Sequence, residues 1–143
     1  MGKITRQDVL DILTNDWGNY VSKFQSLSPE AKSAFLEKQG YKRLADLLSH
    51  IMAWWEVGLQ AIENFRTAPD YKQPEIDVDV FNARAVEKVH NLTDRNVIQS
   101  FEEMRRKFVD VVTNLTDNDF QNDKIVNQIN MEFIGHLEDH RIQ

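Results

Sequence analysis

The sequence predicts an all-α protein: a four-helix bundle in up-down-down-up order, with short extra helices in the connections. Apolar residues recur at the i, i+3, i+4 and i+7 spacing of amphipathic helices in four long segments, and no segment shows sustained strand alternation. The connection between the second and third segments, about residues 67–91, is long enough for a crossover between parallel neighbours. The other connections are short and favour antiparallel neighbours.

The first segment carries an apolar stripe over residues 9–24 and is expected to end near Ser28 and Pro29. Serine is a good helix cap and proline is favoured at the first helical position. We therefore expect a short helix from this point through Leu36, ending around Gly40.

The second segment is expected to be helical over about residues 41–66, where a broad apolar stripe runs along one face. Residues 67–91 are the least regular part of the chain, with Pro69 and Pro74 as helix breakers. Within this part, residues 77–83 are expected to open a short helix.

The third segment is expected to begin at Thr93, whose side chain suits an N-cap, with Asp94 in a first turn that favours negative charge. Its apolar stripe covers residues 97–115. The fourth segment is expected to run from about Asn122 to the chain end, with Phe133 among the residues that face inward.

Composition limits the class of function. At 143 residues the chain is expected to form one domain over residues 1–143. A formal net charge of −6 disfavours nucleic acid as a partner, and the lack of cysteine excludes disulfides, thiolate metal sites and a cysteine nucleophile. The first residues carry no apolar signal core, and no stretch approaches the ~20 apolar residues of a membrane span. We expect a cytoplasmic protein with neither nucleic acid nor membrane as partner.

Three histidines, His50, His136 and His140, are the candidate metal ligands. His136 and His140 are one helical turn apart, which places their side chains on one face about 5–6 Å apart at Cβ. If the second and fourth helices are antiparallel, His50 lies at about the same level. Neutral imidazole is a ligand for zinc, nickel and iron. The pattern predicts a His₃ site for such a divalent ion.

The alternative is that these three are interior or boundary histidines held by hydrogen bonds. His90, in the irregular region, is expected at the surface. Asp46 and Glu132 each precede a candidate ligand by one turn, as an orienting carboxylate would, although solvated surface charge is the simpler interpretation of both. Trp54 and Trp55 are interpreted as a pocket wall and a core residue.

The chain resembles the DinB-like superfamily of four-helix bundles over essentially its whole length. The resemblance rests on His50 within Leu-Leu-Ser-His-Ile-Met-Ala-Trp-Trp-Glu at 47–56 and on His-Leu-Glu-Asp-His at 136–140. Within the superfamily, Ala-Trp-Trp-Glu at 53–56 and Val-Asp-Val-Phe-Asn-Ala at 78–83 are most similar to the ClbS/DfsB branch.

The resemblance implies an up-down-down-up bundle, often a homodimer, with a metal ion on His50, His136 and His140. Characterised relatives include metal-dependent transferases of low-molecular-weight thiols and a hydrolase that opens a reactive cyclopropane in a genotoxin. It therefore implies an enzyme that acts on a reactive small molecule in detoxification or self-protection. The chain ends three residues after His140, earlier than the resemblance leads us to expect.

Two other functions stay open on the sequence alone. A non-catalytic bundle with aromatic-rich helices would suit the binding or sequestration of a small apolar ligand, without a metal. A structural or interaction protein would simply bury its histidines. The general base of an enzyme is not assigned by the sequence.

Overall fold

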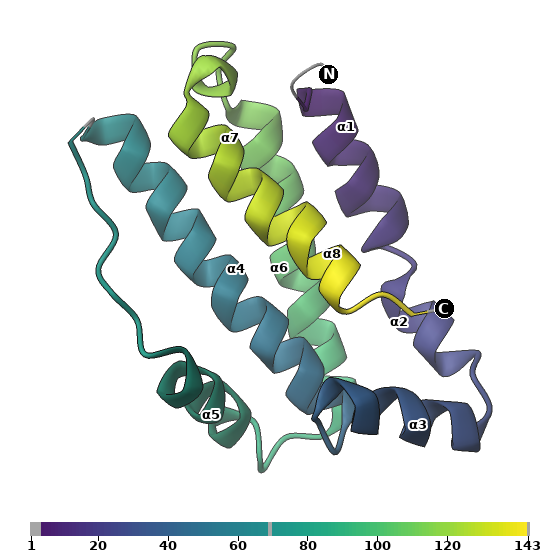
Figure 1. Ribbon diagram of the computed structural model, residues 1–143. Coiled ribbons are helices and arrows are strands. Elements are labelled where there is room, and N and C mark those ends of the chain that lie inside the picture. The colour runs from purple at the N-terminus through teal and green to yellow at the C-terminus, as the bar shows by residue number, and fades with distance from the viewer. Residues whose placement is uncertain (1–3, 69, 143) are drawn as a thin grey trace.

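The computed structural model describes residues 4–68 and 70–142, and every regular element within them is helical (Figure 1). This confirms the all-α class. None of the described helices combines the length and apolar character needed to cross a bilayer. The predicted breaker Pro69 lies outside the described residues. In chain order the elements are α1 (Arg6–Asp11), the π-helical η1 (Ile12–Asp16), α2 (Tyr20–Gln25), α3 (Pro29–Gln39), α4 (Leu44–Thr67), α5 (Val78–Lys88), α6 (Asp94–Asn114), the 3₁₀ turn η2 (Asp119–Gln121), α7 (Asp123–Ile129), the π-helical η3 (Asn130–Gly135) and α8 (His136–Asp139).

Capping residues set the helix ends as the sequence predicts. Ser28 and Thr93 cap α3 and α6 by accepting a hydrogen bond from the backbone N–H three residues further on. Gly40 ends α3 in the left-handed region at φ 83°, where glycine is favoured. Asp77 caps α5, the short helix expected to open within residues 77–83.

The predicted first helix is interrupted. It is divided into α1, the π-helical η1 and α2, with a turn between η1 and α2 that contains Gly18. A Cβ on Gly18 would lie 1.9 Å from the carbonyl oxygen of Thr14, so the backbone passes here only because glycine has no side chain. The apolar stripe still faces the core, because Leu13, Trp17 and Tyr20 are almost fully buried.

Polar contacts show that α4 and α6 run in the same direction. Near the start of both helices, the backbone N–H of Ala45 donates to the Asp94 carboxylate over 2.9 Å. At the other end, Arg66 forms an ion pair with Asp119, just beyond α6, at 3.1 Å. Helix α1 runs the other way, since Arg6 near its start donates to the carbonyl of Leu115 after the end of α6.

The last helical run, α7–η3–α8, packs antiparallel to α4 (Figure 1). The indole N–H of Trp55 donates to the carbonyl of Glu132 at 3.0 Å, whereas His50, earlier in α4, contacts His140, later in the run. The two helices thus bring the candidate ligands to one level.

The predicted fourth helix differs from expectation in two ways. Its middle is π-helical: the backbone N–H of His136 bonds to the carbonyl of Met131, one residue further back than in an α-helix. The carbonyl of Glu132 accepts from the indole N–H of Trp55 at 3.0 Å and lies 3.2 Å from Nδ1 of His136. The run also ends at Asp139 rather than at the chain end. Just after it, the carbonyl of His140 accepts a hydrogen bond from the hydroxyl of Tyr20 at 2.6 Å.

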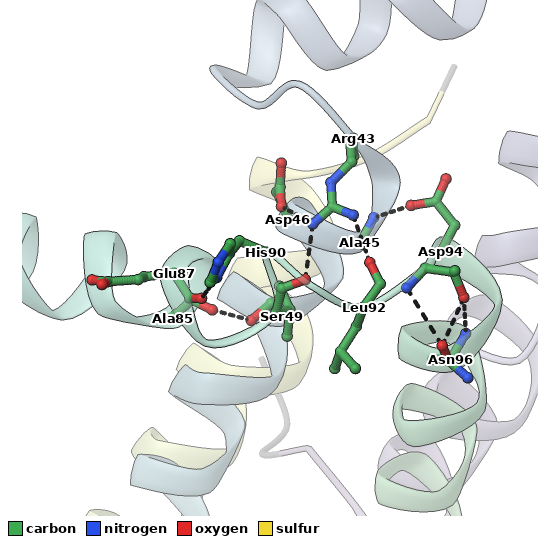
Figure 2. Close-up of polar contacts among 12 residues, drawn as sticks. Arg43, Ala45, Asp46, Ser49, Ala85, Glu87, His90, Leu92, Asp94 and Asn96 are labelled. Atoms are coloured by element: carbon green, nitrogen blue, oxygen red, sulfur yellow. Dashed lines mark hydrogen bonds and ion pairs between the residues drawn. The ribbon is translucent and has the colours of Figure 1, made fainter.

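The first two turns of α4 are tied to α5 and to the α5–α6 connection, as Figure 2 shows. The guanidinium of Arg43 donates to the carbonyls of Leu92, at 2.7 Å, and Val89, at 3.0 Å. Ser49 donates to the carbonyl of Ala85 at 2.6 Å. These contacts hold α5 beside the stretch of α4 that contains His50.

Candidate metal centre

The three candidate histidines converge between α4 and α8. Ring centroids lie 5.0 Å apart for His50 and His140, 5.9 Å for His136 and His140, and 6.0 Å for His50 and His136. The Nε2 atoms of His50 and His140 are 3.2 Å apart. Two imidazole nitrogens bound to one tetrahedral ion at 2.0–2.1 Å would be separated by about 3.3 Å. This pair therefore stands at the spacing of two ligands on one ion.

The tautomer of His50 follows from its neighbours. The indole nitrogen of Trp54 can only donate, and it donates to Oδ1 of Asn82 over 2.7 Å. This identifies the atom as the amide oxygen, and the same oxygen lies 3.0 Å from Nδ1 of His50. His50 must therefore donate from Nδ1, which leaves the lone pair on Nε2.

The other two rings are held in the same manner. Nδ1 of His136 lies 3.2 Å from the carbonyl oxygen of Glu132, and Nδ1 of His140 lies 2.7 Å from Oε1 of Gln39. Each Nδ1 thus donates to an oxygen, and each Nε2 is the nitrogen left for a metal ion. Such bonds from the second ring nitrogen are typical of metal-binding histidines.

The contact between His50 and His140 lacks a donor in this arrangement. With both Nδ1 atoms protonated, two Nε2 lone pairs face each other at 3.2 Å. Such a contact is unfavourable unless a cation or a proton lies between the nitrogens.

Burial keeps the cluster neutral. Desolvation lowers the pKa of all three histidines, and for His140 it does so together with repulsion from His50 and His136, to about 4. Asp139 acts in the opposite direction and is the weaker influence on each. At neutral pH the rings are in the unprotonated form that binds metal ions.

The side chains stop short of a closed coordination site. Among the described residues, no group of three His, Asp or Glu side chains has the geometry to hold a metal ion as the rings now lie. The centroids of two imidazole rings bound to one tetrahedral ion would lie about 5 Å apart. The centroid of the His136 ring lies 5.9 Å from that of His140 and 6.0 Å from that of His50, which is about 1 Å too far. The donor chemistry fits a divalent ion, and metal binding by the three histidines stays a prediction.

The two carboxylates interpreted as surface charge are in fact buried, so that prediction is wrong. Asp46 is 6 % exposed and pairs with Arg43 at 2.9 Å, not with His50. Glu132 is 3 % exposed. It lies three residues after Ile129 and seven after Ile125, which are both buried, so helical spacing places it on the same inward face. His90 is exposed, as predicted.

Sequence reasoning missed Asn82 and Gln39, the residues that hold His50 and His140. Both come from short helices far along the chain from the histidines they contact, so no local spacing relates them. Trp54 is half-buried, with its ring centroid 4.5 Å from that of Phe81. Its interpretation as a pocket wall stays a prediction.

Comparisons of the chain with models of protein families, with curated proteins and with solved structures found no match.

Proposed function

We propose that this protein is a metal-dependent enzyme of the DinB-like type, with His50, His136 and His140 as the metal ligands and a reactive small molecule as the substrate. The observation that carries the proposal is the arrangement of the ring nitrogens. Each Nδ1 is committed to an oxygen acceptor, while two Nε2 atoms face each other at 3.2 Å.

The residues of the chain have defined roles in this proposal. Three neutral imidazoles would leave a coordination position for a water or a thiol, and a divalent ion there lowers the pKa of the bound group. Asn82 and Gln39 orient the rings of His50 and His140. The aromatic rings of Trp54 and Phe81 would form an apolar wall for the substrate.

The reaction is either a thiol transfer or a hydrolysis. In the transfer, the sulfur of a low-molecular-weight thiol bonds to an electrophilic carbon, the bond to the leaving group breaks with its electron pair, and the thiol proton passes to solvent. In the hydrolysis, a water oxygen bonds to the electrophilic carbon, the bond to the leaving group breaks with its electron pair, and the leaving group takes the proton that the water gives up. Where the substrate is a strained ring, the carbon–carbon bond breaks and its carbon takes the proton.

The family assignment is part of the same proposal. It rests on the two histidine motifs and the two segments similar to the ClbS/DfsB branch. An up-down-down-up order is supported by the parallel pair α4 and α6 and by the antiparallel partners of each, α7–α8 and α1. The proposal also includes a cytoplasmic location, which rests on the sequence, and a homodimer, which rests on the resemblance.

A turnover assay tests the proposal. Zinc-, nickel- or iron-loaded protein is incubated with glutathione and chlorodinitrobenzene, and thioether formation is followed by absorbance. We expect metal-dependent turnover that falls at least about 100-fold in His136→Ala, since ligand loss removes the metal. The matched control is His90→Ala, an exposed histidine outside the cluster, which should retain activity.

A metal-free bundle that binds an apolar ligand is the second candidate. It is favoured by the contact between Nε2 of His50 and Nε2 of His140 at 3.2 Å, because a single proton shared between these nitrogens would satisfy them without a metal ion. Protein that takes up no metal, shows no turnover and retains an apolar fluorescent ligand would support this function and contradict the first.

A further inference from the structure

A buried carboxyl group lies beside the histidine cluster without a complete set of partners. Glu132 in η3 is 3 % exposed, and its Oε2 atom has no hydrogen-bond partner of good geometry among the described residues, although, against the rise that burial causes, the nearby backbone N–H of Gly58 acts to lower the pKa of this carboxyl group. Its other oxygen, Oε1, lies 4.0 Å from Nδ1 of His136. A buried, unsatisfied carboxyl oxygen is costly, so a group kept in this position calls for a role.

The opposite helix leaves space for this carboxyl group. A Cβ on Gly58 of α4 would lie 2.3 Å from Oε2 and 2.4 Å from Cγ of Glu132. The backbone of Gly58 is ordinary helix, so its conformation does not require glycine. Glycine is the poorest residue in a helix interior after proline. Its advantage here is the room it gives to Glu132.

The position relative to His136 indicates what the carboxyl group does. It lies on the Nδ1 side of the ring, whereas Nε2 is the nitrogen left for a metal ion. A histidine that binds a metal through one nitrogen commonly donates the other N–H to a carboxylate, which fixes the ring. The main-chain carbonyl of Glu132 is the present acceptor at 3.2 Å, and its carboxyl group is the second acceptor within reach.

We propose that Glu132 is a positioning residue for the metal ligand His136, and that Gly58 provides the space in which its carboxyl group is held. When a divalent ion is bound, Oε1 of Glu132 accepts the Nδ1–H of His136 and holds the ring toward His50 and His140. This inference rests on the proposed metal centre.

Zinc affinity of variants, measured by competition with a chromophoric chelator, tests the inference. Glu132→Ala should weaken zinc binding about 10–100-fold, the usual effect of losing such a partner. Glu132→Gln, which keeps an amide oxygen as acceptor, should recover part of the loss and is the variant to use if Glu132→Ala fails to fold. The matched control Glu138→Gln changes an exposed carboxylate of α8 and should bind zinc as the wild type does.

Gly58→Ala keeps the carboxyl group but displaces it. This variant should weaken zinc binding about as much as Glu132→Ala. The double variant should bind zinc no more weakly than Glu132→Ala alone, because the two changes remove the same interaction. Its melting temperature should exceed that of Gly58→Ala, since removing the carboxyl group removes the clash.

The NMR resonance of the proton on Nδ1 of His136 depends on its hydrogen-bond acceptor, so it separates a positioning role of Glu132 from a role in packing alone. In ¹⁵N-histidine NMR spectra of zinc-loaded protein, this resonance should lie downfield in the wild type and move upfield in Glu132→Ala. If the wild type binds zinc and Glu132→Ala has the same zinc affinity and the same Nδ1–H resonance, this inference is overturned while the metal centre stands. A wild type that binds no zinc would overturn the metal centre and, with it, the inference.

Discussion

Trp54 and Trp55 are neighbours in the chain, yet they belong to two regions of different character. Trp55 is fully buried in an aromatic centre, and its indole N–H donates to the main-chain carbonyl of Glu132 at 3.0 Å. Trp54 is half-buried beside the histidine cluster and donates to the side chain of Asn82. The aromatic centre consists of Trp17, Trp55, Phe101, Phe108 and Phe133, all fully buried.

The two regions use their polar groups differently. In the aromatic centre, the indole N–H groups of Trp17 and Trp55 find main-chain carbonyls, so no side-chain polarity is left over. In the histidine cluster, Asn82 and Gln39 satisfy one nitrogen of each ring they touch, and the second nitrogens of His50 and His140 face each other at 3.2 Å. The aromatic centre thus satisfies its side-chain donors with main-chain carbonyls, whereas the histidine cluster, which we propose as the binding region, depends on side-chain acceptors.

Truncation of the two tryptophans should give the largest contrast. Trp55→Ala should lower the free energy of unfolding by about 3–5 kcal/mol, because it leaves a cavity in a packed core. Trp54→Ala should cost about 1–2 kcal/mol, since this ring is only half-buried. Urea unfolding at fixed pH measures both. Equal losses would contradict the division into two regions.

Zinc should stabilise the protein through the histidine cluster. At zinc concentrations 100-fold above Kd, the free energy of unfolding should rise by about 2.7 kcal/mol, because only the folded state presents the site. The change is measured by urea unfolding with and without zinc. In His136→Ala/His140→Ala it should disappear, while His90→Ala should behave as the wild type. An equal rise in the double variant would place the zinc elsewhere.

Asn82→Ala should weaken zinc binding about 10–100-fold, because His50 loses the acceptor of its Nδ1–H. Asn82→Asp retains an acceptor oxygen for both His50 and Trp54 and should bind zinc more tightly than Asn82→Ala. Isothermal titration with zinc measures these affinities. The control is Asn91→Ala, at an exposed position after α5. Wild-type affinity in Asn82→Ala would show that the ring of His50 needs no support.

The smallest expected effect is on the acid stability of metal-free protein. The pKa of His140 falls from 6.5 to about 4 on folding, so between these values the unfolded state binds more protons. The contribution of His140 to the free energy of unfolding is therefore fully present above pH 6.5 and is lost as the pH falls toward 4. From pH 7 to pH 5 the wild type should lose on the order of 1 kcal/mol relative to His140→Asn, after allowance for solvent screening.

Urea unfolding at the two pH values checks this difference. Glu132, whose pKa is raised by burial to about 8, acts with the opposite sign between pH 4.5 and 8. Its contribution is common to both proteins and cancels in the comparison. Parallel pH profiles for wild type and variant would show that His140 is not desolvated as described.

Local pattern was sufficient for the two uninterrupted long helices, α4 and α6, because amphipathic stripes and caps are properties of neighbouring residues. Thr93, as an N-cap, and Trp55, as a core residue, follow from such pattern. The π-helical segment η3 did not, since no residue type marks it. The burial of Glu132 was missed because a charged residue is usually exposed, although its spacing from Ile125 and Ile129 places it on the inward face. Asn82 and Gln39 could not be assigned, because their roles arise only when α5 and α3 pack beside the histidines.

Metal content measured by plasma mass spectrometry on untagged protein tests the central claim most directly. Wild type and His136→Ala/His140→Ala are dialysed side by side after exposure to zinc, nickel or iron. The account predicts close to one bound ion per wild-type chain and none in the variant. Wild-type protein that neither carries a metal nor takes one up would contradict the metal centre.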